Sequence, residues 1–367
     1  MVEFSNVKLF SATNDLLATA MKEYARNCRL EAVRDSKAFS THSKDEMEVA
    51  INKAFSDALT KQVGYGSEKF GSGNTAVKKY SQSGIVKEFA NSIRDDLLDM
   101  ILPETLLTSS LPYFCDTKFA DLGDTIKFNI ENNALFTVSK AGYRMRNTNL
   151  QKLYRTTITM VGTNHEVTVG SDLFEILIGQ AFIAKDVMKA ALSMQTQMLF
   201  DAYDAFNTQM GALTGNLNVT NYSEGAAINL AQTVTAYNQG KKAVFVGTRK
   251  ALKNLLPSNA NYRYMLDSDY VKIGHILTFN DFDVLPMEQV ADPYNTTPYS
   301  LKLDDTKIYV VSPAAQKIVQ LGVFGGTYSH TDAIYDNANK FQMSTMEKAW
   351  DATVATSAIA GVITKFS

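Results

Sequence analysis

The sequence predicts an α+β protein in which helical and strand-rich stretches follow one another along the chain. Three observations support this class. Apolar residues recur at helical spacing in the first part of the chain, and they alternate with polar residues between residues 113 and 161. A single amphipathic stretch of roughly thirty-five residues follows, which is long for a helix of a globular domain. The remainder mixes short apolar strands with short helices.

Helices are expected in the N-terminal part of the chain over residues 12–35, 44–63 and 85–102. Pro103 is expected to end the third helix, because proline has no N–H to donate to the helix. Between the second and third helices, Gly64, Gly66, Gly71 and Gly73 indicate a flexible break.

Two half-exposed strands are expected next, over residues 126–131 and 154–160, where apolar and polar residues alternate. The segment between them is too polar to form a core of its own. A long two-stranded excursion of this kind is marginally stable by itself. It therefore needs another surface to lie on.

The long helix is expected over residues 172–206, with Asp172 and Glu175 forming a reciprocal cap at its start. At about 1.5 Å per residue it would span roughly 50 Å, more than the diameter of a small domain. A compact α/β unit is expected after it, with strands at 243–246, 282–285 and 307–311. The chain closes with strand-like segments, the last of which alternates up to Ile363.

Composition excludes several classes of protein. Hydrophobic residues make up 45% of the chain and charged residues 20%, which is too apolar for a disordered chain. The net charge is −2, so there is no overall basic excess to bind nucleic acid through its phosphates. No apolar run is long enough to cross a membrane, and the N-terminal residues do not resemble a secretory signal. Cys28 and Cys115 are expected to be free thiols of a reducing cytoplasm.

No catalytic, metal or cofactor site is predicted. The four histidines lie in separate segments, none at metal-ligand spacing from another: His42, His165, His275 and His330. The segment 71–79 has a distant likeness to a phosphate-binding loop, but it lacks the second glycine and a preceding buried strand, so a mobile linker is the favoured interpretation. The glycines at 322, 325 and 326 are expected to let a strand bend.

Two charged clusters are candidates for function. The outer face of the third helix carries Asp95, Asp96 and Asp99, which are open to three interpretations: a solvated helix face, a cation site, or a landing surface for a basic partner. The second cluster is basic and lies in the strand excursion: Lys140, Arg144, Arg146, Lys152 and Arg155. It is either a solvated hairpin or the partner of that acidic face, supplied by a neighbouring copy.

The long N-terminal arm and the strand excursion cannot be buried by a single copy alone. We therefore expect the chain to bury them on further copies of itself, which indicates an assembly subunit and not an enzyme.

The order of these parts resembles the major capsid protein of tailed bacteriophages, the Hong Kong 97-type fold that encapsulin shells also use. The resemblance is architectural and covers nearly the whole chain. It implies an N-terminal helical arm (1–112), an extended β-hairpin loop (113–165), a peripheral domain with a long spine helix (166–221 and 313–367), and an axial domain (222–312).

The resemblance implies a structural protein that self-assembles through hexamers and pentamers into the icosahedral head shell around a double-stranded DNA genome. The partners so implied are the chain itself, portal, scaffolding and decoration proteins, and DNA contacted without sequence reading. The implied location is the virion, with assembly in the host cytoplasm and no membrane. An encapsulin-like nanocompartment that holds cargo enzymes is the alternative.

Overall fold

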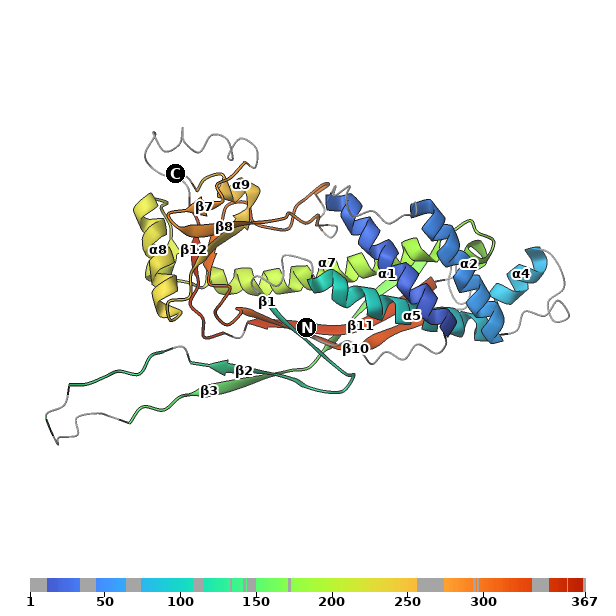
Figure 1. Ribbon diagram of the computed structural model, residues 1–367, viewed down its shortest axis with the longest axis horizontal. Coiled ribbons are helices and arrows are strands. Elements are labelled where there is room, and N and C mark those ends of the chain that lie inside the picture. The colour runs from blue at the N-terminus through green and yellow to red at the C-terminus, as the bar shows by residue number, and fades with distance from the viewer. Residues whose placement is uncertain are drawn as a thin grey trace.

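The apolar stripe of the expected long helix forms α7, Ile183–Gly211, which runs along the centre of the computed structural model (Figure 1). The structure describes residues 12–33, 44–63, 74–107, 115–132, 134–140, 143, 150–170, 173–255, 274–292, 295, 297–331, 343–354 and 356–365. The other described α-helices are α1 (Ala12–Val33), α2 (Lys44–Val63), α4 (Asn74–Ser81), α5 (Gly84–Leu107), α6 (Leu173–Leu177), α8 (Glu224–Tyr237) and α9 (Arg249–Leu252).

The described strands form three sheets. The first, called here the spine sheet, has the order β1-β10-β11-β4, from Cys115–Ala120, Val319–Thr331, Met343–Val354 and Thr163–Gly170. The second, the axial sheet, has the order β5-β12-β9-β6-β8-β7, from Asn218–Val219, Gly361–Ile363, Ile308–Val311, Val244–Thr248, Phe282–Met287 and Thr278–Phe279. The third pairs β2 (Ile126–Glu131) with β3 (Arg155–Met160), antiparallel.

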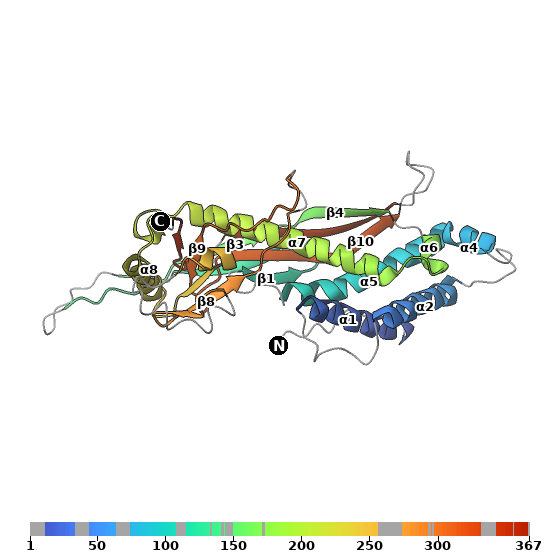
Figure 2. The same cartoon turned by 90° about the horizontal axis from the view of Figure 1, so that it is seen from above.

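The helices α1, α2 and α5 gather at one end of the molecule and the axial sheet lies at the other, with α7 joining them (Figures 1 and 2). The spine sheet covers one side of α7. Strands β2 and β3 leave this body as an extended loop on the side of the spine sheet away from α7.

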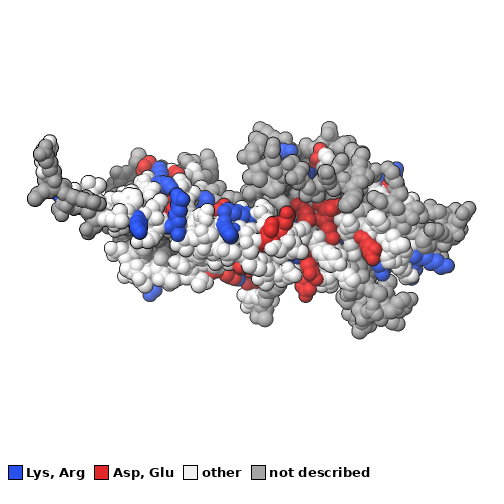
Figure 3. Space-filling model, turned by 90° about the horizontal axis from the view of Figure 1, so that it is seen from below, with Lys and Arg blue, Asp and Glu red and all other residues white. Residues whose placement is uncertain are grey.

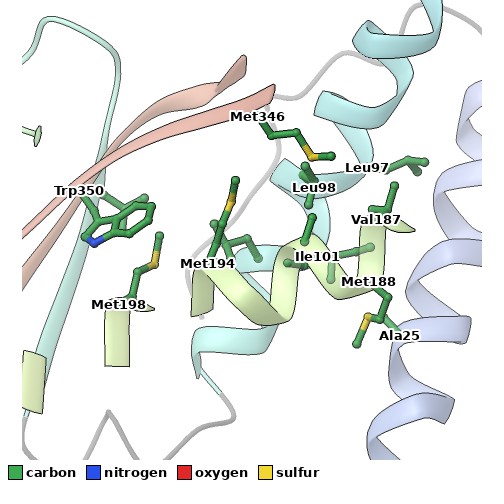
Figure 4. Close-up of a cluster of buried hydrophobic side chains, with 14 of the residues drawn as sticks. Ala25, Leu97, Leu98, Ile101, Val187, Met188, Met194, Met198, Met346 and Trp350 are labelled. Carbon is green, nitrogen blue, oxygen red and sulfur yellow. The ribbon is translucent and has the colours of Figure 1, made fainter. Parts of the chain in front are cut away.

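The main core lies between α7, the N-terminal helices and the spine sheet (Figure 4). Val187 and Met188 of α7 contact the helical side, where Leu97, Leu98 and Ile101 of α5 are buried. Met194 and Met198 face the sheet side, where Trp350 is only 1% exposed. One helix thus buries apolar side chains against two different layers.

This packing corrects the expectation that the N-terminal arm is buried on other copies. In α1 and α2, Leu17, Met21, Ile51 and Phe55 are fully buried within the chain's own core. Their apolar faces are wide enough to pack on each other and on α7 at once. The arm is therefore a helical layer of the subunit, at least over its described residues.

The long helix begins later than expected. Residues 173–177 form α6, and the chain then turns through Gly179, whose φ of +78° suits glycine, before α7 begins at Ile183. The expected cap residue Asp172 lies outside the described residues. Sequence periodicity continues across the turn because α6 buries Leu173 and Ile176 on the same side as α7, and so it conceals the break.

Other boundaries also differ. Helix α5 continues through Pro103 to Leu107, because a proline removes one hydrogen bond but has a φ that suits a helix. Residues 74–81 form α4 and not a linker, with Ala76 and Tyr80 buried. The glycines at 64, 66, 71 and 73 lie outside the described residues.

The two sheets also divide the chain differently from the expected domains. Strand β1, placed in the extended loop by sequence, pairs in parallel with β10 of the spine sheet. Strand β12, placed in the peripheral domain, pairs with β9 of the axial sheet. The sheet that a short strand joins is decided by tertiary pairing, which the periodicity of the sequence does not show.

The expected bend at glycines is confirmed: β10 shifts register between Phe324 and Tyr328, and Gly325 has a φ of +63°.

The turn before α7 is held by a side chain from another helix. Phe182, the residue before α7, makes no side-chain cap, and Asn52 of α2 takes its place. Its amide oxygen accepts from Ile183 N–H at 3.0 Å, and its nitrogen donates to the carbonyls of Ala181 at 2.6 Å and Ile176 at 3.4 Å. A side chain of α2 thus satisfies a backbone hydrogen-bond donor at the start of α7.

We expect Asn52→Ala to lower the free energy of unfolding by about 2 kcal/mol, because it removes the Asn52 partner of the buried Ile183 N–H and of the Ala181 carbonyl. Urea unfolding followed by circular dichroism measures the change. Lys53→Ala, at the exposed neighbouring position of α2, is the matched control. Equal unfolding midpoints for the two variants would show that Asn52 does not secure the turn.

Candidate functional site

The acidic face of α5 lies against the spine sheet of the same chain. Asp99 accepts hydrogen bonds from the backbone N–H of Thr327 at 2.9 Å and from its hydroxyl at 2.7 Å. Asp95 accepts from the backbone N–H of Ser329 at 3.0 Å and from the Ser329 hydroxyl. Thr327 lies inside the β10 bulge, where its N–H has no strand partner, so Asp99 supplies the missing acceptor.

A buried lysine completes this contact. The Nζ of Lys348 lies 2.6 Å from an Asp99 carboxylate oxygen and donates to the carbonyl of Gly325 at 2.8 Å. The Lys348 side chain is 6% exposed. Sequence analysis missed this residue, although a signal was present. Lys348 shares one face of β11 with the buried residues Met346 and Trp350, and a lysine on an apolar strand face needs a buried partner.

The solvated-face interpretation is therefore wrong for Asp95 and Asp99, which bind β10 and β11. A basic surface of another copy would find these two carboxylates already occupied. Asp96 is half-buried beside them. The cation that meets Asp99 is the ammonium of Lys348.

Burial shifts the proton affinity of this cluster. It raises the pKa of Asp95 to about 7, helped by the negative charges of Asp99 and Asp96, while the hydrogen bonds from Ser329 act in the opposite direction. Burial also raises the pKa of Asp96, with a contribution from Asp99. On the same helix, burial lowers the pKa of Arg94, while the negative charges of Asp186 and Asp95 act in the opposite direction.

The base of the extended loop is fixed to the body. Ile126, Phe128 and Met160 pack on Phe324 and Ala349, on the side of the spine sheet away from α7. Gln316 Nε2 donates to the carbonyl of Asn129 at 3.2 Å, and the Ser357 hydroxyl donates to the carbonyl of Glu131. The loop therefore leaves the body in a defined direction.

Beyond its base the loop exposes large apolar side chains. Val138 is 96% exposed and Tyr143 93% exposed, values that are unusual for such residues in a monomer. The other exposed members are Leu135, Phe136, Leu150, Leu153 and Tyr154. This surface has no core of its own, as the sequence predicts.

The structure describes only some of the basic residues of the loop. Lys140 and Lys152 are exposed on it. Arg155 forms an ion pair with Glu131 across the β2–β3 pair, at 3.0 Å, and is thus engaged within its own chain. Arg144 and Arg146 lie outside the described residues.

The far face of the spine sheet carries acidic residues that sequence analysis did not single out. Glu347 of β11 and Glu166 of β4 are direct cross-strand partners, a like-charge arrangement that destabilises an isolated sheet. Glu166 is exposed and Glu347 is half-buried. Their strand neighbours His165 and Lys348 face the helices. Because successive side chains of a strand point to opposite faces, the two glutamates point away from α5. Figure 3 shows that this side of the molecule is divided by charge, with acidic side chains over its middle and basic ones toward β2 and β3.

The histidines have structural settings where the structure describes them. The ring of His165 stacks on Trp350 with centroids 3.8 Å apart, and Asp201 accepts from Trp350 Nε1 at 2.8 Å. His275 is buried in the part of the chain that forms the axial sheet, and His42 lies outside the described residues.

Within the described ranges, no three His, Cys, Asp or Glu side chains gather as a metal site, and no helix is long and apolar enough to cross a membrane.

Comparisons with known proteins gave one family match and several likenesses to solved structures. A family model described as "SPbeta prophage-derived putative capsid protein YonB" matches residues 37–364. No curated protein matches the chain. Among solved structures, the mature capsid of bacteriophage PhiM1 is 11% identical, with a TM-score of 0.41 over 70% of this chain and 87% of that one. The capsid of a native GTA particle is 14% identical, with a TM-score of 0.42 over 70% and 90%. A virus-like particle from Pyrococcus furiosus is 12% identical, with a TM-score of 0.40 over 72% and 97%.

We expect Asp99→Asn to lower the free energy of unfolding by about 3 kcal/mol, because it leaves the buried Lys348 ammonium without its carboxylate. Adding Lys348→Met should recover part of this loss, since a methionine can pack beside Met346 and Trp350. Urea unfolding of the single and double variants measures both changes. A double variant less stable than Asp99→Asn would contradict the ion-pair account.

The stability of the protein should fall as pH rises from about 4 to 7, through the titration of Asp95. The fold raises the pKa of this carboxyl and thus favours its protonated form, so the stabilisation is complete below the ordinary pKa and is lost as pH passes the folded value. We therefore compare the free energy of unfolding of Asp95→Asn with that of wild type at two pH values. The difference should favour the variant more at pH 8 than at pH 5. Asp57→Asn, at an exposed site of α2, is the control. If the stability difference between Asp95→Asn and wild type is equal at both pH values, the assignment of the pH dependence to Asp95 is wrong.

Proposed function

The chain belongs to the family of the SPbeta prophage-derived putative capsid protein YonB, so it is a structural capsid protein of a phage, and from that premise we propose how it assembles. We propose that copies join as hexamers and pentamers into a closed icosahedral head shell around double-stranded DNA. The family match favours this phage capsid over an encapsulin-like nanocompartment. The proposed role requires no catalysis and no cofactor.

The exposed extended loop is the observation that carries the assembly proposal. Its apolar side chains, Val138 and Tyr143 above all, are largely exposed, and burying each on a partner would contribute about 1.5–3 kcal/mol before the costs of association. In a ring of identical subunits each loop can lie on the next copy, and the contact closes because the rotation closes. The firm anchorage of the loop base gives each copy the same direction of reach.

Charge sets the register of this contact in our proposal. The basic loop residues Lys140, Arg144, Arg146 and Lys152 would meet an acidic surface of the neighbouring copy. The sequence suggested Asp95, Asp96 and Asp99 for that surface. Because Asp95 and Asp99 are engaged with β10 and β11, we favour Glu166 and Glu347, whose like-charge pairing a basic partner would relieve.

The surrounding partners follow from the same role. Portal, scaffolding and decoration proteins would join the shell, and packaged DNA would touch its inner surface without sequence reading, as expected from a net charge of −2. The shell would be assembled in the host cytoplasm and would stay in the virion. Negative-stain electron microscopy with sedimentation of the recombinant protein tests the core of the proposal: shells, rings or tubes support it, and a stable monomer at all concentrations contradicts it.

We expect Arg144→Glu, Arg146→Glu and Lys152→Glu together to leave the subunit folded and to prevent shell formation. Arg155 is left in place because it pairs with Glu131. Circular dichroism reports the fold, and sedimentation velocity with electron microscopy reports assembly. The matched control reverses three exposed lysines of α2 and α4, Lys53, Lys78 and Lys79.

A charge swap identifies the acidic partner. Glu166→Lys with Glu347→Lys should block assembly alone and should restore it when the same chain carries the three loop reversals. Normal particles from the loop variant would rule out charge register altogether. Assembly blocked by the loop variant but not restored by the swap would place the acidic partner elsewhere.

A further inference from the structure

A groove of about 440 Å³ lies where the extended loop, α8 and the C-terminal return meet. Leu135 of the loop, Tyr237 at the end of α8 and Ile359 of the return line it. Leu135 is 76% exposed and Tyr237 66% exposed, so two large apolar side chains stand open at its sides. The groove is large enough for a few side chains and too small for a folded domain.

The walls of this groove are preformed. Asn238, which is 1% exposed, joins α8 to the return: its Nδ2 donates to the carbonyl of Ile359 at 2.7 Å, and its Oδ1 accepts from Ile359 N–H at 2.9 Å. Ser357 joins the return to the loop through the carbonyl of Glu131. Gln239, also in the lining, adopts a φ of +61°, a conformation that non-glycine residues seldom take outside constrained sites.

The three walls carry no charge. Residues 132–139 of the loop, 225–240 of α8 and its end, and 352–364 of the return contain no Asp, Glu, Lys or Arg, although charged residues make up 20% of the chain. Helix α8 has one charged residue, Glu224 at its first position, where a solvated helix would ordinarily carry several. Depletion of charge around exposed aromatic and apolar residues is the compositional mark of the centre of a protein interface. Nucleic acid is a poor occupant, because the residues that line the groove include no cation to meet phosphates.

We propose that this groove receives apolar side chains of a second copy of the chain. The inference rests on the proposed function, and it adds a surface that is distinct from the charged loop contact. A second copy is the occupant because one wall, the loop, continues directly into the apolar surface that the proposed shell buries on a neighbour. The groove and residues 132–139 of the loop then form one uncharged strip, which ends at Lys140.

Leu135→Arg and Tyr237→Arg test the groove, each introducing a charge into a neutral lining. Because both side chains are largely exposed, the variants should fold and unfold in urea like wild type. They should also fail to form particles at concentrations where wild type assembles. Leu122→Arg is the matched control, since Leu122 is 77% exposed and lies outside the groove on the turn between β1 and β2.

Hydroxyl-radical footprinting of wild type separates this proposal from the assembly itself. Tyr237 and Leu135 should be modified severalfold more slowly in particles than in dissociated subunits. Particles in which both residues remain as reactive as in free subunits, or normal particles from the arginine variants, would overturn the groove contact and leave the proposed function standing. A small molecule found in the groove of free subunits by native mass spectrometry would also overturn it. Absence of any wild-type assembly would overturn both proposals.

Discussion

The burial of α7 is the constraint on which the rest of the structure depends. Its first half packs on α1, α2 and α5, and its other side packs along β10 and β11. Near its end, the Tyr203 hydroxyl lies 3.1 Å from that of Tyr309 in the axial sheet, and the ring of Phe206 meets Tyr309 edge-on. Most of the stability of a helix in a protein comes from packing of its apolar face, so the layers that cover α7 are what stabilise it.

The polar contacts serve the same arrangement. Asn52 completes the start of α7 from α2, and Asp99 and Lys348 join α5 to the spine sheet that lies under α7. These contacts are buried or half-buried, so each is costly to break and specifies one relative placement of the layers. The subunit body is therefore rigid at the points where its helices and sheets meet.

What the body does not cover is equally informative. The extended loop, the outer face of the spine sheet and the groove beside α8 all leave apolar or like-charged groups exposed. An isolated soluble protein would seldom keep three such surfaces. In the shell that we propose, these surfaces would be complementary in kind: the basic loop with the acidic sheet face, and the uncharged groove with apolar side chains.

The sequence by itself determined the α+β class, most of the helices, the β2–β3 pair and the bend at the β10 glycines, because each depends on local periodicity or backbone freedom. It also supported the resemblance to phage capsid proteins, which the family match confirmed. Only the tertiary structure decided that α1 and α2 belong to the subunit's own core, and that β1 and β12 join different sheets from those expected. It also decided the role of Asp95 and Asp99. The sequence pattern of an acidic helix face is the same whether that face meets water or a strand more than two hundred residues away. Only the fold brings Thr327, Ser329 and Lys348 to this face.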